Sequence, residues 1–553
     1  MEFPSRTTVK AHLIGIGPAP AVSNNSDLSV AREYHEATKH SEISVRGPGH
    51  YLDWESKPAA FKVYRDLPAK PLPTDFPLPS MNALECVGRL DPVEIAERMG
   101  VGSLASVFFF AAGITRRLRS SSGDLYTRAA SATGALYPIE VYVVCGPLGD
   151  LEAGVYHFGP GDFALTRLRR GDFRGYLNRL AGGKRGEVPL APATIVLTSL
   201  AWRNAWKYQA RSYRHWFWDS GVIASNLLAT CISLGFRARL LMGFDDSQVG
   251  ALLGLEEGKE APVALAPIGM GVSKAETVEM GGGEPEPIAP AYLPLSKEEV
   301  DYPIIWKTNG ASSLSGSEVE GWTRPPVRTG SQRGAFPKSF TIEPEFTEPS
   351  LPPGLGEVIL KRGSTRRFAR RPIMFRQLST VLHCSTRGIP TDFLDPGDSL
   401  IETYLIANSV EGLPPGTYHF DRASGALDQL KAGTFRDAAS FLCLEQPLFG
   451  DASVTLFLMA DLKPVLSSLG NRGYRAAQFE AGAVAGKVYL SAYAQGMGAS
   501  GSTFYDDYVT EFFAPHAAGK SPMIAVGVGI PAYDARPGKI LAGKLRHEDV
   551  LRA

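Results

Sequence analysis

The sequence lacks an excess of charge of either sign. Lysine plus arginine and aspartate plus glutamate each number 57 in 553 residues, so the formal net charge is zero. A chain without an overall basic or acidic field is poorly suited to bind nucleic acid or an anionic membrane surface. We therefore expect a small-molecule or peptide substrate, with neither nucleic acid nor a membrane as a partner.

Cysteine is scarce, and its spacing excludes two common uses. The cysteines form no Cys-x-x-Cys pair and number five: Cys86, Cys145, Cys231, Cys384 and Cys443. An odd number of isolated cysteines fits neither a disulfide framework nor a zinc site. We expect no metal, and we expect a reducing compartment.

Long apolar runs are also missing. The run from Leu104 to Ile114 is shorter than the roughly 20 residues that span a bilayer. Glycines and a proline interrupt the apolar residues after Lys10 before they form a signal-peptide core. These absences favour a cytoplasmic protein.

The sequence contains two copies of one pattern. Several matches lie 262 residues apart: Ile139-Glu140-x-Tyr142 with Ile401-Glu402-x-Tyr404, and Gly154-Val155-Tyr156-His157-Phe158 with Gly416-Thr417-Tyr418-His419-Phe420. Others lie 261 residues apart: Arg211, Tyr213, Arg214, Gly221, Gly235, Asp245 and Asp246 with Arg472, Tyr474, Arg475, Gly482, Gly496, Asp506 and Asp507. One deletion accounts for the slip. A period of this length indicates two copies of a whole domain, which we expect to pack about a pseudo-two-fold axis.

Composition and periodicity suggest how the chain is divided. The predicted units are an N-terminal extension (1–75), a first domain (76–275), a linker rich in proline, glycine and serine (276–345) and a second domain (346–553). A β-branched run at 139–144 predicts a strand, and apolar residues at three- and four-residue spacing from Arg211 to Gly235 predict a buried helix. A further helix is expected through 104–114. The fold class is therefore α+β.

Lys207 and Tyr208 stand at or just before the start of the predicted helix. A desolvated lysine beside a tyrosine can exchange a proton near neutral pH, so the two could form an acid–base pair. The alternative is a solvated lysine next to a core tyrosine, and the dipeptide alone favours that alternative.

Two segments of the second copy could hold an anion or a flat ring. Arg362, Ser364 and Arg366 offer two guanidinium groups and a hydroxyl, which together can bind a phosphate; a solvated basic patch is the alternative. The glycine-rich segment from Gly498 to Thr503 is predicted to be a turn whose backbone approaches a ligand closely. Neither the G-x-x-x-x-G-K nor the G-x-G-x-x-G pattern accompanies that segment, so its signal is weak when taken alone.

The motifs together resemble the flavin-dependent nitroreductase superfamily, and within it the SagB-type azoline dehydrogenases. The resemblance covers nearly the whole chain except the linker. It rests on R-x-S-x-R-x-F (362–368), S-x-x-G-A-L-Y-P (131–138), G-x-Y-H-F, K-Y-x-x-R-x-Y-R (207–214), and the closing G-F-D-D (243–246) and G-S-T-F-Y-D-D (501–507).

The resemblance implies two nitroreductase-like α/β domains that form an intrachain pseudo-dimer, with FMN at their interface. One chain would then contain the whole pseudo-dimer and could exist as a monomer. The implied cofactor-binding residues are Arg362, Ser364, Arg366, Gly498, Ser500, Gly501 and Thr503 from the second copy, and Ser131, Gly134, Ala135 and Leu136 from the first. Lys207 and Tyr208 are the implied catalytic residues. Their partners at the 261-residue offset are Ser468 and Leu469, and the first copy has only Arg89 near its opening. We therefore expect one FMN per chain.

The expected function is an FMN-dependent oxidation of a C–C or C–N single bond in a peptidic azoline or an amino-acid-derived group. Two alternatives stay open: an NAD(P)H-dependent nitro- or quinone-reductase, and a flavin-poor scaffold that binds a peptide or a partner protein. Arg211, Tyr213 and Arg214 have counterparts in the second copy, so we assign them to helix packing and domain pairing. His35 and His40 are expected on the surface of a helical turn, since no third histidine lies nearby to complete a metal site.

Overall fold

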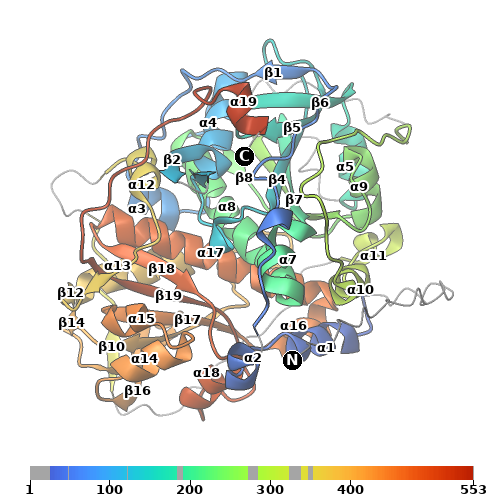
Figure 1. Cartoon of the computed structure of the whole chain (residues 1–553). Helices are drawn as coiled ribbons and strands as arrows, with labels where there is room; N and C mark the ends of the chain where they lie inside the picture. Colours follow the sequence, from blue (N-terminus) through green and yellow to red (C-terminus); the bar gives the residue numbers. More distant parts are fainter. Residues whose placement is uncertain are drawn as a thin grey trace, which may run out of the picture.

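The computed structural model describes residues 25–47, 49–120, 123–183, 191–271, 284–322, 338–346 and 353–551. It contains two antiparallel sheets with helices between and around them (Figure 1). Two features of the predicted linker, Gly281-Gly282-Gly283 and Pro325-Pro326, lie outside the described residues.

The first sheet has seven strands. In spatial order they are β1 (Ala69–Pro71), β6 (Ala164–Arg170), β5 (Gly154–Gly159), β4 (Ile139–Cys145), β7 (Ala193–Leu200), β9 (Glu260–Met270) and β8 (Arg237–Ala238). Every residue of β4 and β7 is buried, as expected for central strands covered on both faces. The predicted strand at 139–144 is confirmed.

The second sheet repeats this arrangement. Its strands are β10 (Ser339–Thr341), β16 (Ala426–Ala432), β15 (Gly416–Asp421), β13 (Glu402–Ala407), β17 (Val454–Ala460), β19 (Ser521–Pro531) and β11 (Phe368–Ala369), with β18 (Gly498–Ser502) also pairing β19. β10 lies at the edge of this sheet as β1 does in the first. Since β10 belongs to the segment predicted as a linker, part of that segment is a sheet strand. The exact domain boundaries stay a prediction.

Two long helices form the centre of the molecule. α8 (Ser212–Ser233) and α17 (Arg472–Ala494) are buried along almost their whole length and pack against each other between the sheets (Figure 1). α8 confirms the helix predicted between Arg211 and Gly235, and α4 (Val101–Ala112) confirms the helix predicted through 104–114. A helix without a polar face must be covered on all sides, and here the other domain supplies part of that cover.

Shorter elements surround this centre. The helices are α1 (Ser29–Ala37), α2 (Glu42–Arg46), α3 (Ala83–Gly88), α5 (Arg174–Leu180), α7 (Ala201–Tyr208), α9 (Asp246–Leu253), α10 (Pro303–Ala311), α11 (Gly316–Gly321), α12 (Leu355–Lys361), α13 (Phe375–Thr386), α14 (Arg436–Leu442), α15 (Pro447–Asp451), α16 (Leu462–Leu469), α18 (Asp506–Phe512) and α19 (His547–Leu551). Single 3₁₀ turns are η1 (Trp54–Ser56), η2 (Thr133–Ala135) and η3 (Gln209–Arg211), and two small two-stranded sheets pair β2 (Ile114–Ser120) with β3 (Gly123–Arg128) and β12 (Ile373–Met374) with β14 (Val410–Glu411). No helix in the described ranges is both long and apolar enough to cross a bilayer.

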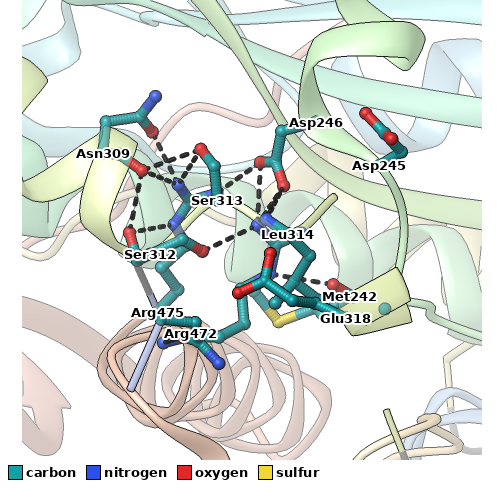
Figure 2. Close-up of polar contacts among 12 residues, drawn as sticks. Met242, Asp245, Asp246, Asn309, Ser312, Ser313, Leu314, Glu318, Arg472 and Arg475 are labelled. Carbon is teal, nitrogen blue, oxygen red and sulfur yellow. Dashed lines mark hydrogen bonds and ion pairs between the residues drawn. The ribbon is translucent and has the colours of Figure 1, made fainter. Parts of the chain in front are cut away.

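Reciprocal ion pairs join the two domains. Arg214 of α8 lies 2.8 Å from Asp506 at the start of α18, and Arg211 lies 3.1 Å from the same carboxylate. In the opposite direction, Arg472 and Arg475 of α17 lie 2.6 and 2.7 Å from Asp246 at the start of α9 (Figure 2). These buried contacts agree with the assignment of the arginines to domain pairing.

The same contacts correct one detail of the sequence alignment. Asp246 and Asp506 each begin a helix and each bind two arginines of the other domain, so they are equivalent although they lie 260 residues apart. The sequence repeat pairs Asp506 with Asp245 instead, at an offset of 261 residues. A second single-residue deletion, between Gly496 and Asp506, accounts for the difference.

Segments outside the two repeats complete each arginine cluster. Arg214 donates to the His35 carbonyl and to the Thr38 hydroxyl, both near the end of α1. Arg475 donates to the Ser312 hydroxyl and to the Asn309 carbonyl, at the end of α10 (Figure 2). The N-terminal extension and the linker therefore contribute matching contacts at the two ends of the interface.

These contacts also show that the expected surface position of His35 is wrong. His35 is buried, and its Nδ1 lies 3.3 Å from the hydroxyl of Tyr474 on α17. Local sequence could not indicate this position, because the partners of α1 lie more than 170 residues away in the chain.

Candidate active site

Lys207 and Tyr208 form the last turn of α7, and a strained residue follows them. Gln209 has φ 49° and ψ −140°, which separates α7 from α8. Gly470 has nearly the same conformation at the equivalent place in the second domain, with φ 66° and ψ −160°. A residue with a β-carbon in such a conformation costs about 1–3 kcal/mol and persists only where the surrounding structure enforces it. The backbone after Tyr208 is therefore held in a glycine-like bend by a residue that is not glycine.

Tyr208 is half-buried, and its hydroxyl faces the backbone of another segment. A β-carbon on Gly134 would lie 2.5 Å from the Tyr208 Oη, so only glycine fits against this hydroxyl without movement. The ring meets His215 edge to face, with centroids 4.6 Å apart. Burial raises the pKa of Tyr208 well above its usual value, and the negative charge of Asp219 raises it further. At neutral pH the phenol is therefore protonated.

Lys207 is exposed, and its Nζ lies 5.4 Å from the centre of the Tyr208 ring. Exposure leaves the ammonium group hydrated, whereas a basic lysine at neutral pH needs desolvation or a neighbouring positive charge. Any desolvation of Lys207 would have to come from bound ligands. The interpretation of the pair as a solvated lysine beside a packed tyrosine consequently stays open.

The segment that contacts Tyr208 carries most of the first-copy residues proposed from sequence. Ser131, Ala135 and Leu136 are half-buried, and Gly134 is exposed. Gly134 and Ala135 have left-handed backbones, with φ 63° and 56°. Ala135 adopts this conformation despite its β-carbon, as Tyr137 does with φ 50°. Strained turns of this kind cluster at ligand-binding and catalytic sites.

The segment from Gly498 to Thr503 corrects a prediction. It was expected to be a turn, but Gly498 to Ser502 form the strand β18, antiparallel to β19. The small side chains serve close packing, since a β-carbon on Gly498 would lie 2.2 Å from the Thr365 hydroxyl. The 362–366 segment can therefore approach β18 closely, and the Thr365 amide donates to the Ala499 carbonyl at 2.8 Å.

Tyr489 of α17 connects two of the predicted ligand-binding groups. Its hydroxyl lies 3.2 Å from the Ser364 hydroxyl and accepts a 2.5 Å hydrogen bond from the Gly501 amide. Ser500 is buried on the same strand. Sequence reasoning missed Tyr489, because nothing in a long buried helix distinguishes a tyrosine that faces a site from one that packs in the core.

The two arginines of the basic motif lie in different surroundings. Arg362 is buried, and its guanidinium donates to the carbonyls of Ala129 and Arg128 at 3.0 and 2.9 Å. It thus connects the second domain to the segment leading into Ser131. Arg366 is exposed, and among the residues that the structure describes its guanidinium has no hydrogen-bond partner. Of the two, Arg366 has the guanidinium that is available to a ligand.

Residues of both domains therefore meet at one boundary. Arg362 contacts the first-domain backbone just before Ser131. Thr503 of the second domain accepts a 2.9 Å hydrogen bond from Arg211, three residues after Tyr208. The structure thus joins two of the predicted second-copy residues, Arg362 and Thr503, to first-domain residues that lie within three positions of Ser131 and Tyr208 in the chain.

The equivalent boundary on the other side of the molecule is closed by direct contacts. Asp392, which precedes the first central strand of the second domain, accepts hydrogen bonds of 2.9 and 2.8 Å from the amides of Met242 and Gly243. Nearby, the Leu240 amide donates to the Pro390 carbonyl at 2.8 Å. The segment 238–243 corresponds to β18 and the residues after it. The first boundary has the small residues of β18, whereas at the second boundary the Asp392 side chain already occupies the backbone amides of Met242 and Gly243.

Asp219 of α8 is a further residue that the sequence did not single out as functional. Its carboxylate accepts two hydrogen bonds from Thr133 and lies 3.5 Å from the Asn204 amide nitrogen. The repeat contained a usable signal, because Glu480 stands at the matching position of α17, 261 residues later.

Comparisons with known proteins agree with this architecture. The sequence profile of the nitroreductase family matches residues 109–270 and again 359–530, together more than half of the chain. The chain therefore belongs to the nitroreductase family, with two family domains in tandem. Members of this family are oxidoreductases and typically depend on FMN.

One solved structure resembles nearly the whole molecule. A protein of Anabaena variabilis named as a nitroreductase is 26% identical, with a TM-score of 0.73, over 91% of this chain and 99% of its own. The tandem arrangement is therefore shared with that protein.

Two curated proteins match shorter parts. A protein of Methanocaldococcus jannaschii named as a nitroreductase is 27% identical over 166 residues, covering 30% of this chain and 78% of its own length. McbC, a microcin B17-processing protein of Escherichia coli, is 26% identical over 136 residues, covering 24% of this chain and half of McbC.

Proposed function

We propose that this protein is an FMN-dependent dehydrogenase with one composite active site per chain. The observation that carries the proposal is the meeting of both domains at one boundary. There the Tyr208 hydroxyl lies against Gly134, and Thr503 is joined to Arg211. The opposite boundary is closed by Asp392, which supports a single site.

The residues at this boundary fit FMN chemically. The exposed Arg366 guanidinium and the nearby Ser364 hydroxyl can bind a phosphate through charge-assisted hydrogen bonds, each contributing about 1.5–3 kcal/mol. Gly501 is exposed, and a β-carbon placed on it would have no heavy atom nearer than 3.5 Å, so a planar ring could approach the backbone. Ser131, Gly134, Ala135 and Leu136 would contribute from the other domain, with Gly498, Ser500 and Thr503 beside them.

The proposed reaction removes two electrons and two protons from a C–C or C–N single bond, as in the oxidation of a peptidic azoline. FMN, when bound, supplies the two-electron acceptor. The likeness to McbC supports a peptide substrate, since McbC is named for the processing of microcin B17. That likeness covers only half of McbC, so the comparison alone does not establish a peptide substrate, and the substrate is part of the proposal.

Tyr208 and Lys207 would divide the proton transfer between them. Because Tyr208 is a neutral phenol, it can accept a proton only while it gives one up. Lys207 is exposed beside the Tyr208 ring. Bound substrate that excludes water from its side chain would favour release of the ammonium proton to solvent, and the resulting neutral amine would take the substrate proton. The five cysteines are all free and buried, which is compatible with the reducing cytoplasm that we propose as the compartment.

The proposal is tested by purifying the protein and incubating it with azoline-containing peptides. We expect a yellow protein, release of FMN on denaturation, and peptides that become 2 Da lighter per oxidised ring, about one ring for each equivalent of electron acceptor. A colourless protein that binds no added FMN would overturn the proposal in favour of the scaffold alternative.

A nitro- or quinone-reductase is the second candidate, and the exposure of Lys207 favours it. Such a reaction takes hydride from a nicotinamide and needs no lysine base. The two candidates differ in one simple observation. Rapid bleaching of the flavin by NAD(P)H in the absence of a peptide would favour the reductase, whereas bleaching only by an azoline peptide would favour the dehydrogenase.

A further inference from the structure

Asp219 is a buried acid that forms no ion pair with any residue that the structure describes, although Arg128 lines the same small cavity. Asp219 lies on the domain-pairing helix α8, and its side chain is buried. Its Oδ1 accepts hydrogen bonds from both the amide and the hydroxyl of Thr133, at 2.9 and 2.8 Å. Its Oδ2 lies 3.5 Å from the Asn204 amide nitrogen on α7. One carboxyl group thus bonds to the turn at Thr133 and lies beside the helix that carries Lys207 and Tyr208.

The turn held by Asp219 is the one that contacts Tyr208. Thr133 is followed by Gly134 and Ala135, both with left-handed backbones. Glycine adopts this conformation freely, but at Ala135 it is costly without enforcement from the surrounding structure. Gly134 is in direct contact with the Tyr208 hydroxyl. A chain of contacts therefore runs from Asp219 through Thr133 and Gly134 to Tyr208.

The second domain supplies an internal control for this arrangement. Glu480, equivalent to Asp219, accepts hydrogen bonds from the Ser399 hydroxyl and the Leu400 amide, at 2.6 and 2.8 Å. A carboxylate on the central helix thus anchors the segment before the first central strand in both domains. In the second domain, however, Leu469 replaces Tyr208, so the same anchor has no phenol to orient.

We propose that Asp219 is a positioning residue of the active site, which fixes the turn at Thr133 and thereby sets the orientation and the electrostatic environment of the Tyr208 hydroxyl. This role rests on the proposed function of Tyr208. The anchor at Glu480 is structural only.

The charge of Asp219 changes near neutral pH. Burial raises the pKa of Asp219 to about 7, although the hydrogen bonds from Thr133 and Asn204 lower it. Among the described residues, the neighbouring ionisable groups are Tyr208, Tyr137 and Arg128, which lines the same small cavity as Asp219. The pKa of each tyrosine is raised by burial and also by the charge of Asp219, and burial lowers the pKa of Arg128 to about 10, so it stays charged near neutral pH. On the other side of Tyr208, burial keeps the pKa of His215 well below its usual value. Of Asp219, Tyr208, Tyr137 and His215, it is Asp219 that changes charge near pH 7.

A measurement that needs no turnover tests the contact directly. The holoprotein is labelled with fluorotyrosine, and the fluorine resonance of Tyr208 is assigned by its loss in Tyr208→Phe. We expect that resonance to shift with pH around 7 in the native protein and in Glu480→Gln. In Asp219→Asn, which keeps an oxygen for Thr133 but cannot ionise, the shift should vanish. A pH titration of the Tyr208 resonance that is unchanged in Asp219→Asn overturns the proposal.

Turnover provides the second readout. Asp219→Ala removes the anchor and should lower kcat by roughly 10- to 100-fold with little change in KM, because small misplacements of a reacting group have effects of this size. Asp219→Asn should restore most of kcat and alter its pH profile near 7. Glu480→Ala, the matched control, should stay within about 2-fold of native kcat while losing comparable thermal stability. Equal losses of kcat in the two alanine variants contradict the positioning role. If the native protein oxidises no peptide, only the proposed function fails, and the fluorine titration still decides the contact.

Discussion

Gly221 of α8 and Gly482 of α17 occupy equivalent positions and lie directly opposite each other at the centre of the interface. A β-carbon on Gly221 would lie 2.3 Å from the Phe479 carbonyl oxygen, and one on Gly482 would lie 2.3 Å from the Trp218 carbonyl oxygen. The two backbones are therefore as close as glycine permits. Gly221 and Gly482 match each other in the sequence repeat, and the close contact of the two helices explains why both positions require glycine.

Replacing Gly482 by alanine should destabilise the protein. The added methyl group meets the backbone of α8, so the helices must separate, at a cost of roughly 1–3 kcal/mol or more. Urea unfolding followed by circular dichroism measures the loss. Gly250→Ala is the control, because a β-carbon there meets no atom within 4 Å and should change stability by no more than about 1 kcal/mol. Equal stability of the two variants would show that the interface can relax without cost.

Removing the charge of Asp506 should cost stability in a pH-dependent way. Burial acts to raise its pKa, but Arg211 and Arg214 outweigh this and hold the pKa at about 2. A lowered pKa contributes stability above the unfolded value of about 3.9, and that contribution disappears as pH falls through about 2. Asp506→Asn should therefore lose about 3–5 kcal/mol at pH 7, because the arginines remain buried without a countercharge.

The loss should shrink when the unfolding of Asp506→Asn and the native protein is compared at pH 7 and in steps below pH 4. Asp507→Asn is the matched control, since the Asp507 side chain is 70% exposed and its ion pair with Lys39 should contribute less than about 1 kcal/mol. A deficit in Asp506→Asn that does not change between pH 7 and the acid range would contradict the ion-pair explanation.

FMN released from the pure protein should approach one equivalent per chain. The second boundary lacks the arginine pair of the 362–366 segment, and Asp392 occupies the amides of Met242 and Gly243 there. Absorbance of the flavin after denaturation, divided by protein from amino-acid analysis, gives the ratio. A reproducible value near two would show that the second boundary opens and binds flavin.

Arg366→Ala should weaken FMN retention and leave the fold intact. The guanidinium is exposed, so its removal opens no core, while the phosphate loses one charge-assisted contact of about 1.5–3 kcal/mol. Titration of the apoprotein with FMN, followed by flavin fluorescence, measures the change. Arg367→Ala removes the exposed arginine next to it and should bind FMN normally. If both variants bind FMN as tightly as the native protein, the phosphate assignment is wrong.

Replacing Lys207 by alanine or Tyr208 by phenylalanine should leave FMN bound and reduce turnover. A positioned acid–base group contributes roughly 10²–10⁴-fold, or about 3–5 kcal/mol of barrier, whereas a surface lysine contributes almost nothing to a rate. Steady-state oxidation of the peptide gives the comparison. Ser468→Ala, at the position equivalent to Lys207, is exposed and should retain native turnover. Retention of more than about a third of the activity in Lys207→Ala would make the reductase the better account.

Much of the fold could be predicted because it repeats. The 261- and 262-residue offsets identified two domains, and the strand at 139–144 and the helix after Arg211 followed from their periodicity. β18 was mistaken for a turn, because a run of glycine and serine has no apolar alternation. It forms a strand because it pairs with β19, and that pairing cannot be predicted from the local sequence.

The site was predictable only in part, and the reason is physical. Arg362 and Arg366 are two positions apart in one motif, yet one is buried against the Ala129 carbonyl and the other is exposed. Whether each arginine is buried or exposed depends on contacts with the other domain, and these contacts cannot be predicted from the motif itself. Asp219 escaped notice for the same reason, since its importance comes from Thr133, which lies 86 residues earlier.

The proposed composite site also changes how the protein should respond to dilution. In a dimer of separate chains, a site shared between subunits is lost when the concentration falls below the dissociation constant. Here Arg362 and Ala129 belong to one polypeptide, so domains that separate remain near each other at an effective concentration that dilution does not alter. Reassembly is then a first-order event, and specific activity should be the same at nanomolar as at micromolar protein.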